Sequence, residues 1–160
     1  MRQHLLLELL RRPLGFAALV LLVLMYLAAI FASFLAPYPP AEQCLDHAFH
    51  PPTGLYWEDG RVWVRIYENA DPAAGRWVPS GEAFPLAWFA SGYPYRLFGL
   101  IPADTHLFQP ATDDPAHRVY LLGSDTTGRD VFTRLLYGAR ISLSIGLIGI
   151  SITMVMGFLV

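Results

Sequence analysis

The chain has 160 residues, of which 54% are hydrophobic and only 15% are charged, and this is too apolar for an ordinary soluble domain. The formal net charge of −2, without a basic patch, argues against nucleic-acid binding. Cys44 is the only cysteine, so no disulfide can form within the chain. The composition therefore indicates a membrane protein.

The N-terminal part of the chain predicts a cytoplasmic segment followed by a transmembrane helix. Residues 1–13 are short and basic, and their leucines could form one or two turns of an amphipathic helix at the membrane surface. Residues 14–36 carry no charge and are long enough to cross a bilayer. A cleaved signal peptide begins similarly, but this run is longer than a usual signal core and lacks a convincing cleavage site. We therefore predict a first span over 14–36.

The distribution of arginine sets the expected orientation. Three arginines precede the first span and none follows it closely, which places the N-terminus in the cytoplasm. Arg129, Arg134 and Arg140, which precede the second apolar run, weaken this inference because they put positive charge on the proposed outer side.

Residues 37–120 predict a folded extracytoplasmic insert. This stretch holds 12 of the 13 prolines and ten acidic residues against five arginines, yet it is too rich in tryptophan, tyrosine and phenylalanine for a disordered linker. Asp59-Gly60, followed by the alternating run 62–67, is a strong hairpin signal. With a further turn at 73–75, we predict a three-stranded meander over 55–79. The proline-spaced residues 84–110 are expected to be irregular.

Residues 121–140 predict a capped amphipathic helix at the membrane interface. Thr127 and Asp130 fit a capping box, which starts a helix near Gly128. Asp130 and Arg134 have the i,i+4 spacing of an ion pair. The expected apolar face consists of Val131, Phe132, Leu135, Leu136 and Ala139.

Residues 141–160 contain no charge and are expected to begin a second transmembrane helix. Small residues recur along it at steps of three or four, a pattern that lets another helix approach closely in lipid. They are Gly138, Ser142, Gly146, Gly149, Thr153 and Gly157. The run shows no polar flank before residue 160, so we interpret the sequence as a truncated form or fragment of a longer product.

The segment GSDTTGRDVFTRLLYGARISL, residues 123–143, resembles the stretch before the second membrane helix in inner-membrane permeases of ABC importers for dipeptides, oligopeptides and nickel. Ser124 stands where that family more often has threonine. The family motif falls on Gly123, Asp125, Gly128, Arg129, Asp130, Arg134, Gly138 and Arg140. We interpret these residues as structural or assembly elements, although Arg129 and Asp130 could contact substrate.

Two further clusters of polar residues contain side chains that can bind metals. Cys44, His47 and His50, beside Asp46, could in principle hold zinc or nickel, but ordinary loop residues are the favoured interpretation. Another group consists of Asp113, Asp114 and His117, and it is read as a solvated turn. The sequence contains no P-loop and no G-x-S-x-G or H-E-x-x-H motif, so it predicts no catalytic site, metal or cofactor.

The sequence thus predicts a membrane α-helical fold with two transmembrane helices, a small aromatic-rich and partly β extracytoplasmic insert, and an amphipathic interfacial helix before the second span. The resemblance implies a permease subunit that works with a second permease subunit, ABC ATPase subunits and an extracytoplasmic solute-binding protein, in the cell inner membrane. The insert is longer than is typical of dipeptide permeases, which leaves the solute open. The alternatives are a two-span protein whose extracytoplasmic domain binds a ligand or partner, and an anchored enzyme.

Overall fold

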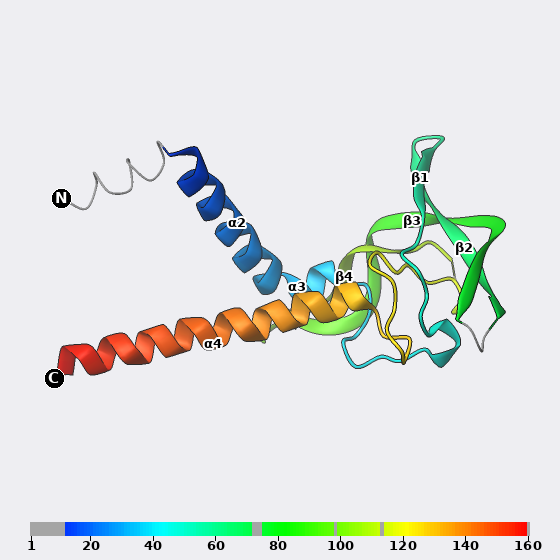
Figure 1. Cartoon of the computed structure of the whole chain (residues 1–160). Helices are drawn as coiled ribbons and strands as arrows, with labels where there is room; N and C mark the ends of the chain where they lie inside the picture. Colours follow the sequence, from blue (N-terminus) through cyan, green and yellow to red (C-terminus); the bar gives the residue numbers. More distant parts are fainter. Residues whose placement is uncertain (1–11, 72–74, 98, 113, 160) are drawn as a thin grey trace.

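A computed structural model describes residues 12–71, 75–97, 99–112 and 114–159. Two long helices extend from one side of a β-rich insert, and the N-terminal end of the first and the C-terminal end of the second lie far from that insert (Figure 1). The expected amphipathic segment at residues 1–13 falls almost wholly outside the described residues.

The first helix, α2 (Pro13–Ile30), begins with proline at its first turn, where the missing N–H is not needed. The helical path breaks at Phe31 and resumes as the single turn α3 (Ala32–Leu35). Ala36 is extended because it precedes Pro37, and this ends the helical region. The predicted apolar helix over 14–36 is therefore present, with a break near its end.

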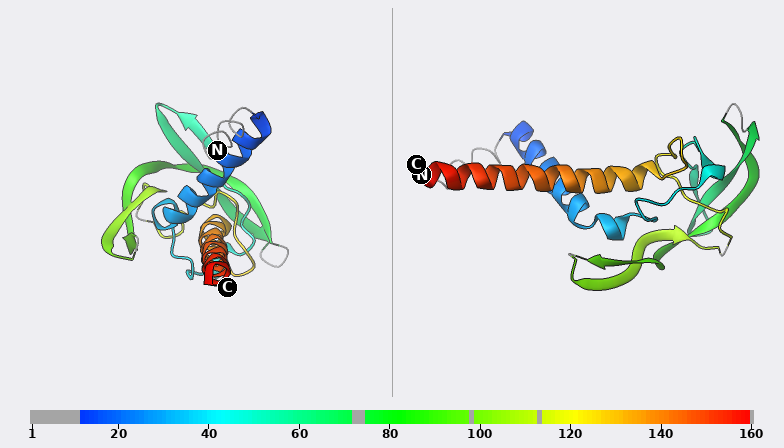
Figure 2. Two further views of the ribbon diagram at one scale, coloured as in Figure 1. Left: turned by 90° about the vertical axis from the view of Figure 1, so that its left-hand side faces the viewer. Right: turned by 90° about the horizontal axis from the view of Figure 1, so that it is seen from below.

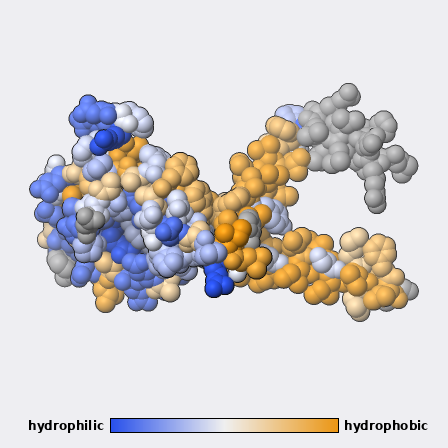
Figure 3. Space-filling view, turned by 180° about the vertical axis from the view of Figure 1, so that it is seen from behind, coloured by the Kyte–Doolittle hydropathy of each residue, from blue (hydrophilic) through white to orange (hydrophobic). Residues whose placement is uncertain are grey.

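The second long helix, α4 (Val131–Leu159), is continuous. By length and composition, both α2 and α4 could cross a membrane. Figure 3 shows their apolar surfaces extending from the more polar insert. Near the insert, α3 packs against α4 in a small cluster of Ala32, Ala36 and Leu136.

The insert contains a short 3-10 helix, η1 (Leu45–His47), and a four-stranded antiparallel meander in the order β1-β2-β3-β4. The strands are β1 (Leu55–Glu58), β2 (Arg61–Asp71), β3 (Arg76–Leu97) and β4 (Ile101–Pro110). The first part of β3 pairs with β2 and the second part pairs with β4. The sheet bends strongly between these two parts (Figure 2).

The hairpin prediction at Asp59-Gly60 is confirmed. Glu58 pairs with Arg61, and both turn residues have positive φ, at 49° and 76°, as a tight hairpin turn requires. Gly75 also has positive φ between β2 and β3, while the predicted turn residues 73 and 74 lie outside the described part.

The predicted three-stranded meander over 55–79 is present as β1, β2 and the start of β3. The prediction of an irregular stretch over 84–110 is wrong, since most of that stretch lies in β3 and β4. Proline does not break these strands because of where it falls. Pro94 lies in the register shift between Ser91 and Tyr95, and Pro102 and Pro110 lie on the edge strand β4. At a bulge or sheet edge, proline need not donate to a strand partner.

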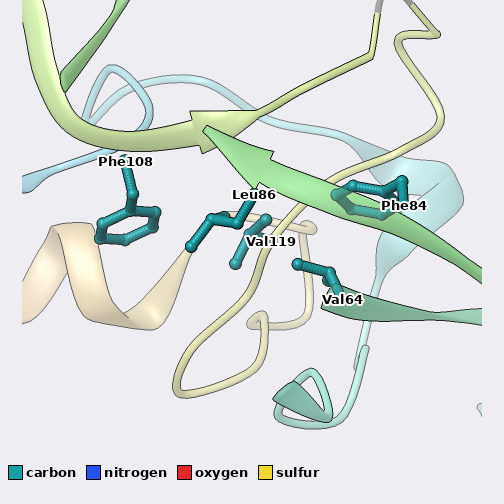
Figure 4. Close-up of a cluster of buried hydrophobic side chains, with 5 residues drawn as sticks. All are labelled: Val64, Phe84, Leu86, Phe108 and Val119. Atoms are coloured by element: carbon teal, nitrogen blue, oxygen red, sulfur yellow. The ribbon is translucent and has the colours of Figure 1, made fainter. Parts of the chain in front are cut away.

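The core of the insert joins the sheet to the segment that precedes α4. Figure 4 shows its buried side chains, which are Val64, Phe84, Leu86, Phe108 and Val119. Phe132 at the start of α4 packs against the same cluster. The insert and the second long helix therefore share a hydrophobic core.

Candidate functional site

The motif residues before α4 form a compact loop, residues 123–130, which we call the GRD loop. Its backbone folds back on itself: the Asp125 N–H donates to the Arg129 carbonyl at 3.0 Å, and the Val131 N–H donates to the Gly123 carbonyl at 3.1 Å. Gly128 has positive φ within this turn. The predicted helix start near Gly128 is thus three residues early, because the backbone groups of residues 123–130 form hydrogen bonds within a loop instead of a helix.

The GRD loop is attached to the segment 44–50, which is far away in sequence. The Ser124 N–H donates to the His50 carbonyl at 2.9 Å, and the His50 N–H returns a bond to the Ser124 hydroxyl at 2.8 Å. The Ser124 hydroxyl also donates to the His47 carbonyl. The Phe49 N–H donates to the Asp125 carbonyl at 3.1 Å. These bonds fasten the two segments together through their backbones.

Two glycines of the motif allow this attachment. A Cβ added to Gly123 would lie 2.7 Å from the His50 carbonyl oxygen, and one added to Gly128 would lie 1.7 Å from the Cys44 carbonyl oxygen. Both glycines also have positive φ, at 78° and 71°. Glycine is required at these positions both by close backbone approach and by backbone conformation.

Asp125 is the charged centre of the loop. Its Oδ1 accepts from the Thr127 N–H at 2.9 Å, the Thr127 hydroxyl at 2.8 Å and the Arg129 N–H at 3.0 Å. Its Oδ2 accepts from Arg129 Nε at 2.8 Å and Arg134 Nη1 at 2.6 Å. Although burial favours the neutral acid, these bonds, led by the one from the Arg129 backbone, hold the pKa of Asp125 well below its usual range.

Asp130 caps α4. Its Oδ2 accepts from the Thr133 N–H at 2.9 Å and the Thr133 hydroxyl at 2.6 Å. Burial raises the pKa of Asp130, against the lowering effect of these bonds. The predicted cap at Thr127 and the predicted Asp130–Arg134 ion pair are both wrong. Asp130 is turned toward the helix N-terminus, while the loop brings Asp125 to Arg134.

The remaining motif residues lie along α4. Arg140 Nη1 is 3.5 Å from the Ser33 hydroxyl of α3, and Arg140 also lines a cavity of about 220 Å³ between α2 and α4. Gly138 has open space where a side chain would stand, with nothing within 4 Å among the described residues. Leu135, expected on the apolar face, is 60% exposed, because α4 packs on α3 through Leu136 instead.

His47 and His50 belong to a cluster of rings under the GRD loop. His50 is buried, with its ring 4.5 Å from Trp77 and 5.0 Å from Tyr120, while His47 Nδ1 is 3.2 Å from the Tyr120 hydroxyl. Burial lowers the pKa of His50 to about 4. Within the described ranges, no three His, Cys, Asp or Glu side chains form a metal-binding group, so the alternative of a Cys44–His47–His50 site finds no support.

The second polar group behaves as a turn. The Ala116 N–H donates to Asp114 Oδ1 at 2.9 Å, and His117 Nε2 is 3.8 Å from Asp114 Oδ2. Asp113 lies outside the described residues. These contacts fit the expected solvated turn.

Sequence reasoning missed a second attachment between the ends of the insert. The Val119 N–H donates to the Tyr38 hydroxyl at 2.7 Å, and the Arg118 guanidinium lies 4.1 Å from the centre of the Tyr38 ring. Arg118 also pairs with Glu42 at 2.6 Å. Burial raises the pKa of Tyr38 far above its usual value, so it stays a neutral phenol. No short-range pattern could have revealed these contacts.

Comparison with known proteins gives a coherent group of relatives. Residues 2–52 match the family model described as the N-terminal TM domain of oligopeptide transport permease C. The di/tripeptide transport system permease protein DppC of Pseudomonas aeruginosa (strain UCBPP-PA14) is 26% identical over 141 residues, which is 88% of this chain and 27% of that protein.

The dipeptide transport system permease protein DppC of Escherichia coli (strain K12) is 28% identical over 128 residues, or 80% of this chain and 23% of the relative. The chain thus spans about a quarter of the length of the curated relatives it matches. No solved structure matches it.

Proposed function

We propose, from the match of this chain to the N-terminal portion of peptide ABC importer permeases, that it is a membrane-spanning part of such a permease subunit and forms part of the translocation pathway for peptides or a similar small solute. The similarity carries this proposal, because it extends over 80–88% of the chain and so goes well beyond residues 2–52. These relatives are transport components rather than enzymes.

The arrangement of the helices supports a two-span topology. The insert joins the C-terminal end of α2 to the N-terminal end of α4, and the opposite ends of both helices lie far from it (Figure 1). If both helices cross the inner membrane, the insert lies wholly on one side. We place residues 37–140 outside the cytoplasm and the N-terminus inside it. The arginines that precede the first span favour this orientation only weakly, and the resemblance to permeases with a cytoplasmic N-terminus decides the choice.

In this proposal the GRD loop has a structural role. It fixes the start of α4 to the segment that follows α2, through Gly128 against Cys44 and Ser124 against His50. Arg129 and Arg134 are both engaged by Asp125, so their positive charges are already paired within the chain. The loop therefore sets the relative position of the two spans instead of holding a solute.

The partners follow from the same proposal. They are a second permease subunit, ABC ATPase subunits that hydrolyse ATP, and an extracytoplasmic solute-binding protein. The stripe of small residues on α4 supports packing against another helix, since a side chain at Gly138, Gly146, Gly149 or Gly157 would meet no described atom within 4 Å.

The test is transport by the gene product that contains this chain, co-purified with the products of neighbouring genes and reconstituted in proteoliposomes. We expect uptake of a labelled dipeptide that requires both ATP and the solute-binding protein. A Gly128→Ala substitution should reduce assembly and uptake, whereas Gly60→Ala at the remote hairpin should preserve both. Failure to co-purify with any permease or ATPase, together with ligand binding by this protein alone, would overturn the proposal in favour of a two-span binding protein.

A further inference from the structure

The β3–β4 hairpin runs beside the membrane-proximal ends of the helices. Near the start of α4, Phe108 of β4 lies 6.3 Å from Phe132 between ring centres. Farther along the hairpin, the Tyr93 hydroxyl lies 3.3 Å from the Tyr137 hydroxyl. Five helical residues separate the two α4 positions, which corresponds to a rise of about 7.5 Å along the helix. The hairpin therefore follows α4 in the direction of the apolar spans.

The position of the hairpin is fixed from a second side by α3. Phe89 of β3 lies 6.1 Å from Phe34 between ring centres, and Gln109 Nε2 of β4 donates to the Pro37 carbonyl at 2.7 Å. Figure 2 shows the hairpin extending past α3 toward the side on which α2 and α4 continue. Its end is thus held near the level where the membrane is expected to begin.

The end of this hairpin is apolar and exposed. Leu100 is 80% exposed and Ile101 is 57% exposed, and Leu97 pairs directly with Ile101 across the two strands. We call Leu97, Leu100 and Ile101 the hairpin tip. Adjacent apolar leucines and isoleucines at a strand edge favour association or aggregation in water, so their exposure indicates a partner.

Side chains behind the tip have the character of an interfacial belt. Trp88 and Phe89 are 52% and 67% exposed, and Tyr93 and Tyr95 follow them along β3. Tryptophan and tyrosine concentrate at membrane–water interfaces because they join an apolar ring to a polar group. Arg96, which is exposed beside the tip, can keep its guanidinium among lipid headgroups while its stem lies along apolar surface.

The helices beside this hairpin also expose apolar side chains. Ile30 at the end of α2 is 41% exposed, and Ile141 of α4 is 61% exposed. Beyond Pro85, β3 pairs only with β4, so both strands of the hairpin end have an open edge. Such an end can enter the hydrated headgroup region, where water satisfies the edge groups, but not the hydrocarbon core. These observations favour lipid over a soluble protein as the neighbour.

We propose that the hairpin tip, Leu97, Leu100 and Ile101, inserts into the outer leaflet interface of the membrane and anchors the insert against the bilayer. This inference rests on the proposed spanning of α2 and α4 and is independent of the transported solute. The anchor would limit rocking of the insert about the break at Phe31, and so fix the face that the insert presents to other proteins.

The test uses the full chain in phosphatidylcholine liposomes, with Cys44→Ser as background and one environment-sensitive fluorophore attached to a new cysteine. Leu100→Cys reports on the tip, Glu58→Cys on the remote β1–β2 hairpin, and Ile148→Cys on the middle of α4. Quenching is measured with lipids carrying a shallow or a deep nitroxide, and with aqueous iodide.

We expect the Leu100 label to be quenched about twofold or more by the shallow nitroxide lipid and to be protected from iodide, while the Glu58 label shows the reverse. A Leu100 label that is open to iodide, or shielded from both quenchers, would overturn the anchor; the latter result would indicate a protein neighbour. The Ile148 label separates the two proposals. If deep nitroxide quenches it while the Leu100 label remains in water, the anchor alone fails; if deep nitroxide does not quench it, the spanning topology fails as well.

Discussion

Replacing Gly128 with alanine should disrupt the attachment between the GRD loop and the segment 44–50. The new Cβ would lie 1.7 Å from the Cys44 carbonyl oxygen, whereas Cβ contacts under 3.0 Å are essentially never seen, so the two backbones must separate by at least about 1.3 Å. The φ of +71° adds a cost of about 1 kcal/mol for any residue with a side chain. Separation also breaks the bonds that Ser124 and Asp125 make across this contact.

Gly60 provides a matched control for the backbone term. Its φ is +76°, and an added Cβ meets nothing within 4 Å among the described residues, so alanine there should cost only about 1 kcal/mol. We expect Gly128→Ala to cost about 3 kcal/mol or more, since it combines strain with loss of buried hydrogen bonds.

Thermal unfolding of the chain in detergent, followed by circular dichroism, measures the difference. For a chain of this size, we expect Tm to fall by about 2–4 °C for Gly60→Ala and by about 6–12 °C for Gly128→Ala. Amide hydrogen exchange at His50 and Ser124 should also accelerate in the Gly128 variant alone. Equal Tm shifts with unchanged exchange would refute the close contact between the two loops.

Asp125→Asn should lower Tm. Because the pKa of Asp125 is lowered in the folded state, its contribution to stability is fully present above the usual aspartate pKa and is lost progressively as pH falls from there through the lowered value. A pH series of melts should show that this acid-dependent loss is absent from Asp125→Asn. Asp130→Ala should lower stability by about 1–2 kcal/mol through loss of the α4 cap, and Thr127→Ala should lower it by less. If denaturant melts show equal losses for the two variants, Asp130 is not the cap. Burial lowers the pKa of His50 from 6.5 to about 4, so between these values the unfolded state binds more protons than the folded state. The free energy of unfolding should therefore fall as pH drops through this window. His50→Gln should flatten this dependence of stability on pH, and an unchanged dependence would refute the effect.

Local patterns predicted the features that depend on nearby residues. The Asp59-Gly60 turn follows from two residues that tolerate positive φ between β-forming runs, and the apolar helices follow from their uninterrupted composition. The strands over 84–110 were not predicted, because prolines normally argue against strands. Whether a proline falls on a sheet edge or in a bulge, as Pro94 and Pro102 do, depends on which strands become neighbours.

The motif shows the same division. Its sequence indicated that Gly128, Asp125 and Arg134 mattered together, but spacing alone paired Arg134 with Asp130 and started the helix too early. Both Asp125 and Asp130 could pair with Arg134, and the path of the loop decides between them. Asp130 accepts from Thr133 at the start of α4, and Asp125 pairs with Arg134.

The sequence by itself determined the two apolar helices, the first hairpin and the family resemblance, since each rests on composition or on residues a few positions apart. Only the tertiary structure decided that Gly128 meets Cys44, that Val119 bonds to Tyr38, and that the β3–β4 hairpin lies beside α4. These contacts join residues that are distant along the chain. Their geometry follows from the packing of the whole insert on the shared core around Phe132, which no local pattern encodes.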